Sequence, residues 1–224
     1  MQIRKGEVYM RVLIITGGAI DHEFAAAYIK QHTFDRIIAA DRGLHFCKAA
    51  GILPDVILGD FDSVQNVELN YYQENYRERI WKYPARKNAT DTELALNLAL
   101  EYGSKKITIL GATGTRLDHV LGNIQLLKKA LSQGAVCKLV DSHNRIRLID
   151  GRLILHKDRQ FGDYISLIPF SPVVEGLTLE GFEYPLAHFN LASGNGRGIS
   201  NRIQDETAYI AFSKGFLLVV ESKD

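Results

Sequence analysis

The sequence predicts a two-domain protein: an α/β domain with a parallel sheet over residues 10–142, followed by an all-β domain over residues 143–224. Up to about residue 141, short apolar runs alternate with segments of helical periodicity, as they do in parallel α/β sheets. After that point turn residues separate short apolar runs and no helical period is left. This second pattern is typical of an antiparallel sandwich or barrel.

The expected strands of the first domain are the apolar runs at 11–15, 36–40, 55–58, 106–110 and, more weakly, 136–140. Residues 79–83 are a candidate for an extra strand. The expected helices lie between the strands, at 21–31, 43–50, 66–76, 91–102 and 118–132. The clearest helix is 91–102, whose apolar stripe consists of Leu94, Ala95, Leu98 and Tyr102. Thr90-x-x-Glu93 has the spacing of a capping box, and Gly103 is placed to end the helix.

The expected strands of the second domain lie at 145–149, 152–156, 164–168, 174–179, 207–212 and 216–221. The composition, 46% hydrophobic and 24% charged, is ordinary for a globular protein, and the net charge of +1 gives no support to a nucleic-acid-binding surface. The apolar run at 12–15 is too short for a signal peptide, and no segment approaches the roughly 18 apolar residues of a membrane span. The two cysteines lack metal-ligand spacing, which favours a reducing, cytoplasmic location.

Polar and glycine-rich segments follow the expected parallel strands, at the sheet edge where α/β proteins bind ligands. These segments are Thr16-Gly17-Gly18, Asp41-Arg42-Gly43, Gly59-Asp60-Phe61-Asp62-Ser63 and Gly111 to His119. A basic segment, Arg86 to Thr92, leads into the helix at 91–102. Because the carboxyl ends of parallel strands meet at one edge, we expect these segments to converge there.

Asp60 and Asp62 follow a strand at spacing i, i+2, so both carboxylates can turn toward one point. Mg²⁺ is bound by one or two carboxylates together with substrate phosphates, which makes this pair a candidate metal site. Asp41 and Asp91 add acid to the same edge, and a cation would offset the repulsion between the four groups. The alternative is that Gly59 to Ser63 is only a turn, where Gly, Asp and Ser are common.

The remaining residues of this edge suit a polyphosphate. Glycines allow close approach of the backbone, and helix N-termini present free N–H groups to anions. Lys87 and Arg116 can neutralise charge that develops on transferring phosphoryl oxygens. The P-loop signature G-x-x-x-x-G-K-[ST] and the dinucleotide-binding signature G-x-G-x-x-G are both absent, so neither of those classes is predicted.

A set of motifs resembles the thiamine pyrophosphokinase (thiamine diphosphokinase) family: Gly59 to Ser63, Thr90-Asp91-Thr92-Glu93, Gly114 to His119 and Ser200-Asn201. They occur in the order and spacing of that family, from about Met10 onward. The resemblance implies a Rossmann-like α/β domain, a β-sandwich domain for thiamine binding and dimerisation, and a homodimer with shared active sites. It also implies that Mg²⁺ assists, that the thiamine hydroxyl attacks the β-phosphorus of ATP, and that AMP leaves.

The resemblance further implies roles for individual residues. The metal ligands would be Asp41, Asp60, Asp62 and Asp91. The residues acting in the transfer step would be Lys87, Asp91, Arg116 and Asp118, with Asp91 and Asp118 as candidates for the general base. The substrate-binding residues would be Thr16, Gly17, Gly18, Asp41, Arg42, Gly43, Ser63, Thr90, Thr92, Gly111 and Thr113, with Ser200 and Asn201 holding thiamine.

The expectation is therefore an ATP-dependent diphosphotransferase that uses ATP and thiamine and has no nucleic-acid or membrane partner. One alternative is a pyrophosphokinase for another small alcohol, such as a hydroxymethylpterin. Another is a non-catalytic sensor of thiamine or nucleotide, although a sensor would not need four carboxylates for a metal. A metal-dependent phosphohydrolase is a third and weaker alternative.

Overall fold

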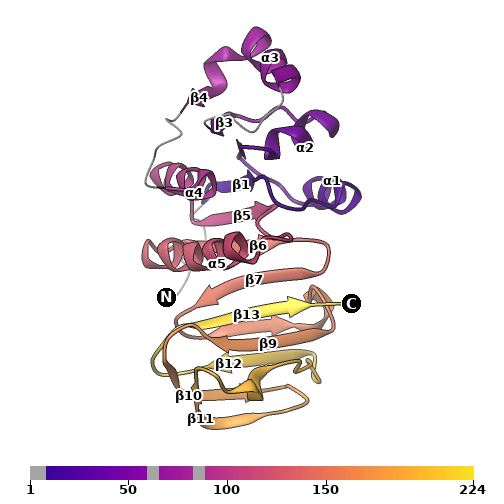
Figure 1. The fold of residues 1–224 in the computed structure, drawn as a ribbon. Coiled ribbons are helices and arrows are strands. Elements are labelled where there is room, and N and C mark those ends of the chain that lie inside the picture. Colours follow the sequence, from indigo (N-terminus) through magenta and orange to yellow (C-terminus); the bar gives the residue numbers. More distant parts are fainter. Residues whose placement is uncertain (1–8, 60–65, 83–88) are drawn as a thin grey trace. The chain divides into compact units, whose positions relative to one another are not determined.

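The structure is a computed structural model and describes residues 9–59, 66–82 and 89–224. The chain divides into two compact units, unit 1 (Met1–Cys137) and unit 2 (Lys138–Asp224). Unit 1 is an α/β structure with a parallel sheet, and unit 2 consists of antiparallel strands (Figure 1). The predicted fold class is therefore confirmed.

The parallel strands of unit 1 lie in the spatial order β4-β3-β2-β1-β5. Their bounds are β1 (Arg11–Ile15), β2 (Arg36–Ala40), β3 (Val56–Gly59), β4 (Ile80–Lys82) and β5 (Lys106–Leu110). The central strand β1 is inaccessible from Val12 to Ile15, as expected for an apolar run that is covered on both faces. The candidate strand at 79–83 exists as the short edge strand β4.

The helices of unit 1 are α1 (His22–Gln31), α2 (Gly43–Ala49), α3 (Asn66–Asn75), α4 (Asp91–Glu101) and α5 (Leu117–Ser132), with a 3₁₀ turn η1 at Arg77–Arg79. Figure 1 shows α4 and α5 on one side of the strands and α1 and α2 on the other. Both faces of the sheet are thus covered, as the alternating pattern predicted. None of the helices in the described part of the chain has the length and apolarity of a membrane span.

Helix α4 begins and ends where the sequence predicted, but its buried stripe is different. The Thr90 hydroxyl accepts from the Glu93 N–H at 3.2 Å, while the Glu93 carboxylate accepts from Lys129 at 2.7 Å and so serves an ion pair with α5. Gly103, at φ +74°, ends the helix. The buried apolar residues are Ala95, Leu96, Leu98 and Ala99. The helix contacts both the sheet and α5, so the predicted Leu94 and Tyr102 are only partly buried.

Unit 2 contains β7 (Asn144–Ile149), β8 (Leu153–His156), β9 (Tyr164–Pro169), β10 (Val173–Glu180), β11 (Leu186–Ala192), β12 (Thr207–Ala211) and β13 (Leu217–Ser222), with 3₁₀ turns η2 (Lys157–Arg159) and η3 (Gly196–Gly198). Strand β6 (Val136–Val140) crosses the point where the units divide and pairs with β7. The sequence-based boundary after residue 142 falls between these two strands. One sheet has the order β7-β13-β9 and the other β11-β10-β12-β8.

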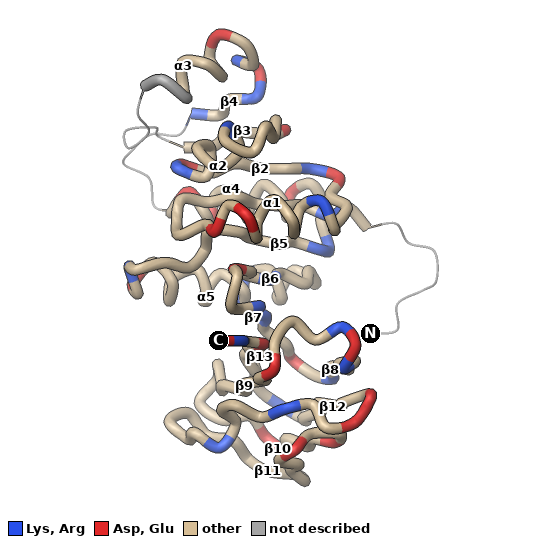
Figure 2. The backbone as a smooth tube through the Cα atoms, turned by 90° about the vertical axis from the view of Figure 1, so that its right-hand side faces the viewer, with Lys and Arg blue, Asp and Glu red and all other residues tan. Residues whose placement is uncertain are grey.

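The two sheets of unit 2 share one apolar core, which makes this unit a sandwich. Leu167 and Val219 of the first sheet pack in the same cluster as Leu177 and Ile210 of the second. Side chains from facing sheets interdigitate in this way in β-sandwiches. Lys and Arg residues are interspersed with Asp and Glu residues along the described parts of both units (Figure 2).

A buried carboxylate lies in β13. Glu221 is inaccessible to solvent and accepts hydrogen bonds from Arg145 at 2.8 and 2.5 Å and from Arg147. Burial alone would raise the pKa of Glu221, but the hydrogen bonds and charges of the two arginines outweigh it and hold the pKa below its usual value. A charged group is therefore part of the interior of unit 2.

Candidate active site

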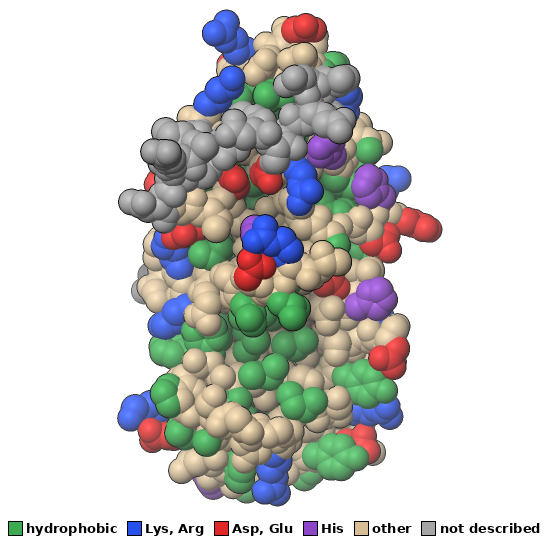
Figure 3. All heavy atoms as spheres, viewed as in Figure 1, with side chains coloured by type: hydrophobic (Ala, Val, Ile, Leu, Met, Phe, Trp, Pro, Cys, Tyr) green, Lys and Arg blue, Asp and Glu red, His purple; other side chains and the backbone are tan. Residues whose placement is uncertain are grey.

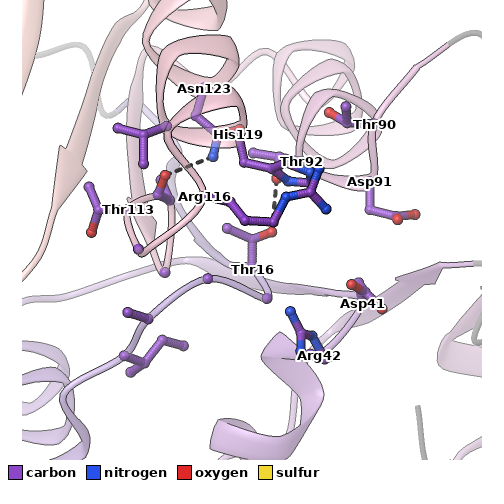
Figure 4. A pocket seen from close by; sticks show the side chains of 18 of the residues that line it. Thr16, Asp41, Arg42, Thr90, Asp91, Thr92, Thr113, Arg116, His119 and Asn123 are labelled. Carbon is purple, nitrogen blue, oxygen red and sulfur yellow. Dashed lines mark hydrogen bonds between the residues drawn. The ribbon is translucent and has the colours of Figure 1, made fainter. Parts of the chain in front are cut away.

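A cavity of about 740 Å³ opens at the carboxyl edge of the parallel sheet, within unit 1 (Figure 4). The loops after β1, β2 and β5 and the starts of α4 and α5 line it. The predicted site residues among its lining are Thr16, Gly17, Gly18, Asp41, Arg42, Thr90, Asp91, Thr92, Gly111, Thr113 and Arg116. Acidic, basic and histidine side chains gather on this face of unit 1 (Figure 3).

The loop after β1 packs so closely against the loop after β5 that a side chain cannot fit. The Gly18 N–H donates to Gly111 O at 2.8 Å, and the Ala19 N–H donates to Thr113 O at 2.8 Å. A Cβ on Gly18 would lie 2.2 Å from Gly111 O, a distance that real Cβ atoms do not show. Gly18 is thus required for the two loops to form one wall of the cavity.

Two carboxylates from different elements lie on the same side of the cavity. Figure 4 shows Asp41, in the loop after β2, and Asp91, at the start of α4, on the side opposite Thr113 and Asn123. Asp41 has φ +49°, a backbone conformation that is uncommon outside glycine and that clusters at functional sites. Gly43, which follows in the same segment, does not line the cavity; a Cβ there would lie 2.1 Å from Ile15 O.

Two buried threonines join the loop after β1 to α4. The hydroxyls of Thr16 and Thr92 lie 2.8 Å apart, and both residues are buried. A buried hydroxyl pair satisfies its own hydrogen bonding and fixes the two segments relative to each other. The bond therefore holds the start of α4, including Asp91, against the end of β1.

Arg116 and Asp118 form a pair at the start of α5. The guanidinium donates to the two carboxylate oxygens at 2.6 and 3.3 Å, and both side chains are exposed. This hydrogen bond raises the pKa of Arg116 and lowers the pKa of Asp118. Arg116 lines the cavity, whereas Asp118 is not part of its lining. A carboxylate with a lowered pKa and an arginine partner is a poor proton acceptor.

Ser200 and Asn201 lie in unit 2, and the structure shows the Asn201 side chain engaged within the chain. Asn201 is buried; its amide oxygen accepts from the N–H groups of Tyr184 at 3.0 Å and Arg202 at 2.9 Å, and its amide nitrogen donates to Tyr184 O at 2.9 Å. Ser200 is exposed, has φ +56°, and donates its N–H to the Ser166 hydroxyl at 3.0 Å. The amide thus supports the backbone around it, while the Ser200 side chain faces solvent.

Several predicted residues, Asp60, Asp62, Ser63 and Lys87, lie outside the described part of the chain. Within the described residues, no group of three or more His, Cys, Asp or Glu side chains could hold a metal. Asp41 and Asp91 line one cavity, and their carboxylate oxygens are the ligand type that Mg²⁺ takes in proteins. These two residues therefore fit a site for a hard cation that substrate phosphates and further carboxylates would complete.

Comparisons with known proteins connect this geometry to a family. A model described as the thiamin pyrophosphokinase catalytic domain matches residues 25–139, and one described as the thiamin pyrophosphokinase vitamin B1 binding domain matches residues 152–217. The thiamine pyrophosphokinase of Bacillus subtilis is 38% identical over 198 residues, which are 88% of this chain and 91% of that protein. The chain belongs to the thiamin pyrophosphokinase family.

Solved structures of the thiamin pyrophosphokinase family have the same fold. A crystal structure of thiamine pyrophosphokinase from Bacillus subtilis matches with a TM-score of 0.86 and 36% identity, covering 96% of this chain and 99% of that one. The enzyme from Geobacillus thermodenitrificans matches with a TM-score of 0.84 and 32% identity, covering 96% and 98%. The similarity therefore includes both units of the chain.

Sequence reasoning missed some of the cavity's residues. The residues that line the cavity but were not predicted include Ile20, His22, His45, Phe46, Val120 and Asn123. The sequence does contain a signal for Asn123. Val120, Asn123 and Leu127 follow helical spacing on one side of α5, so an amide interrupts a side that is otherwise apolar. His22, which is exposed, and His45, which is half-buried, left no such signal.

Proposed function

We propose that this protein is a thiamine pyrophosphokinase, which transfers the diphosphoryl group of ATP to the hydroxyl of thiamine and releases AMP. The observation that carries the proposal is the pair of family models, catalytic and vitamin B1 binding, which match the chain in order over its two units. The enzyme class, an ATP-dependent diphosphotransferase, follows from the family. A pyrophosphokinase for a different alcohol is disfavoured because the second match is to a vitamin B1 binding domain.

The cavity supports this function because it offers a polyphosphate several kinds of partner. Backbone N–H groups are available where α4 and α5 begin, and Arg42 and Arg116 supply positive charge. The positive guanidinium of Arg116 is suited to stabilising the negative charge that builds on the transferring group. Groups placed where charge develops in the transition state contribute most to the rate. Phosphoryl transfer needs mainly this kind of positioning and electrostatic stabilisation.

We assign metal binding to Asp41 and Asp91, together with Asp60 and Asp62 on the strength of the sequence. Mg²⁺ held there would offset the negative charge of the phosphates. The protein's own contribution is to hold the carboxylates of Asp41 and Asp91 on one side of the cavity, through the Thr16–Thr92 bond and the backbone of the loop after β2. Both candidates for the general base are weakened: Arg116 lowers the pKa of Asp118, and Asp91 would be a poor proton acceptor while it binds a metal.

We propose a homodimer in which the thiamine-binding residues of one subunit complete the phosphate site of the other. Leu117 and Leu121 are 71% and 62% exposed and lie one turn apart on α5. Exposed apolar side chains of this kind support a contact in which the partner subunit covers them. A cytoplasmic location is supported by Cys47 and Cys137, which are both buried and free.

The test is to incubate the protein with ATP, Mg²⁺ and thiamine and to measure the products by anion-exchange chromatography. We expect AMP and thiamine diphosphate in equal amounts, and no reaction when a hydroxymethylpterin replaces thiamine. Chelation of the metal should stop the reaction. Formation of a pterin diphosphate, or of ADP, would contradict the proposed function.

A further inference from the structure

The cavity in unit 1 has two chemically different ends. On one side lie the carboxylates of Asp41 and Asp91, and on the other lie Thr113 and Asn123 (Figure 4). The side of Asn123 is also apolar: Ile20 packs beside Gly111, and Val120 precedes Asn123 by one turn on the same face of α5. A charged polyphosphate suits the first end, and a flat heterocycle suits the second.

Asn123 is the buried amide at the apolar end. Its side chain donates one N–H to Ala112 O at 2.8 Å, shown as a dashed line in Figure 4, and the residue is 9% exposed while lining the cavity. In the described part of the chain, no other partner of this amide is present. Its second N–H and its oxygen are therefore free to bind a ligand in the cavity.

The bond to Ala112 O fixes which way the amide faces. A backbone carbonyl accepts hydrogen bonds only, so the nitrogen of the Asn123 amide must be the atom beside it, and a flipped amide would bring two acceptors together. The amide consequently presents one donor and one acceptor in a fixed order. An asparagine held in this way pairs with adenine, whose amino group donates while the adjacent ring nitrogen accepts.

Guanine and hypoxanthine carry an oxygen where adenine carries its amino group. That oxygen would face the Asn123 oxygen, and neither could donate, so a buried polar contact would be left unmade. We propose that Asn123 binds the adenine ring of the nucleotide and makes the protein select ATP over GTP and ITP. The proposal rests on the proposed function only in taking ATP as the diphosphoryl donor.

The test measures the affinities of ATP, GTP and ITP by titration calorimetry with Mg²⁺ and without thiamine. For the unaltered protein we expect GTP and ITP to bind about 10- to 100-fold more weakly than ATP, the range of one good bidentate contact to a base. ITP is the sharper probe because it has the oxygen of guanine but not the extra amino group. ITP binding as tightly as ATP would overturn the proposal without any mutant.

The variant Asn123→Ala should bind all three nucleotides within about threefold of one another, because the base-reading contact is gone. The matched control is Gln125→Ala, which removes an exposed amide from the same helix and should keep the preference of the unaltered protein. The ratio of affinities does not depend on the fraction of folded protein. An Asn123→Ala protein that still prefers ATP would contradict the proposal.

These outcomes separate the inference from the proposed function. Synthesis of thiamine diphosphate from ATP, with a nucleotide preference independent of Asn123, would leave the proposed function standing and the inference wrong. Asn123-dependent selection of ATP, without any transfer to thiamine, would do the reverse.

Discussion

Asn201 shows how burial changes the interpretation of a polar motif. The family resemblance implied that Ser200 and Asn201 hold thiamine. In the structure, the amide of Asn201 makes three hydrogen bonds to the backbone of Tyr184 and Arg202, so its capacity is used inside the chain. We therefore propose that Asn201 would act on thiamine binding only indirectly, by holding the backbone beside Ser200, whose side chain is exposed.

We expect Asn201→Ala to lower the melting temperature and to raise the KM for thiamine, while the KM for ATP stays near normal. The loss of stability follows because backbone groups lose their partners, at about 1–3 kcal/mol for each unsatisfied group. Thermal melts and steady-state kinetics measure both effects. Asn195→Ala is the control, because its side chain is exposed and caps one backbone N–H. A thiamine defect with an unchanged melting temperature would instead indicate direct contact.

Arg116 and Asp118 act as one group because the guanidinium donates to both carboxylate oxygens. We expect Arg116→Ala to lower kcat by about 10²- to 10³-fold, the loss seen when one transition-state donor is removed. Asp118→Asn should lower kcat less, because it only loosens the guanidinium.

A double-mutant cycle separates this role of Asp118 from that of a base. If Asp118 acts only through Arg116, then Asp118→Asn should have almost no effect in the Arg116→Ala background. Equal losses in both backgrounds, together with a lost acidic limb in the pH–rate profile, would mean that Asp118 accepts the proton.

At the scale of elements, a close backbone contact positions helix α2. Gly43 begins this helix with its Cα against the end of β1, where a Cβ would lie 2.1 Å from Ile15 O. The sequence predicted a phosphate-binding role for Gly43, whereas in the structure this residue stands behind the cavity and lets α2 approach the sheet. Distances of this kind depend on the packing of two elements and cannot be read from one segment.

We expect Gly43→Ala to destabilise the protein by about 1–3 kcal/mol or more, because the added methyl group must push α2 away from β1. Gly122→Ala is the matched control: nothing lies within 4 Å of the new Cβ, and an alanine inside a helix is favoured by up to about 1 kcal/mol. Urea unfolding of both variants measures the difference. Equal stabilities would mean that α2 can shift at little cost.

Most helices and strands were predictable from the sequence because their apolar residues follow a regular spacing. The missed strand β11 shows where this kind of prediction fails. Strand β11 (Leu186–Ala192) was missed, because His188 has φ +47° and the pairing with β10 shifts register twice. Such bulges break the alternation of apolar and polar residues by which a strand is detected. The loops of the site were predictable for the opposite reason, since each follows a strand of the parallel sheet.

At the scale of the whole molecule, the buried charge of Glu221 makes stability depend on pH. The pKa of Glu221 is lower in the folded protein than its usual value. The carboxylate therefore makes its full contribution to the free energy of unfolding at any pH above the unfolded pKa of about 4.3. As the pH falls through the folded pKa, the carboxylate is protonated and the contribution is lost. The protein should therefore lose stability below about pH 4.

We expect Glu221→Gln to lower the free energy of unfolding at neutral pH by about 3–5 kcal/mol, because two arginines lose a buried partner. The variant should also show a weaker dependence of the melting temperature on acid. Glu175→Gln, which breaks an exposed ion pair with Lys214, is the control and should cost at most about 1 kcal/mol. An unchanged melting temperature for Glu221→Gln would refute the role of this network.

The central claim is that the β- and γ-phosphates of ATP move together from this cavity to thiamine. It is tested most directly with ATP labelled at either the α- or the γ-phosphorus, followed by separation of the products. We expect the α label to appear entirely in AMP and the γ label entirely in thiamine diphosphate. An α label in ADP, or a γ label in free phosphate, would contradict the account.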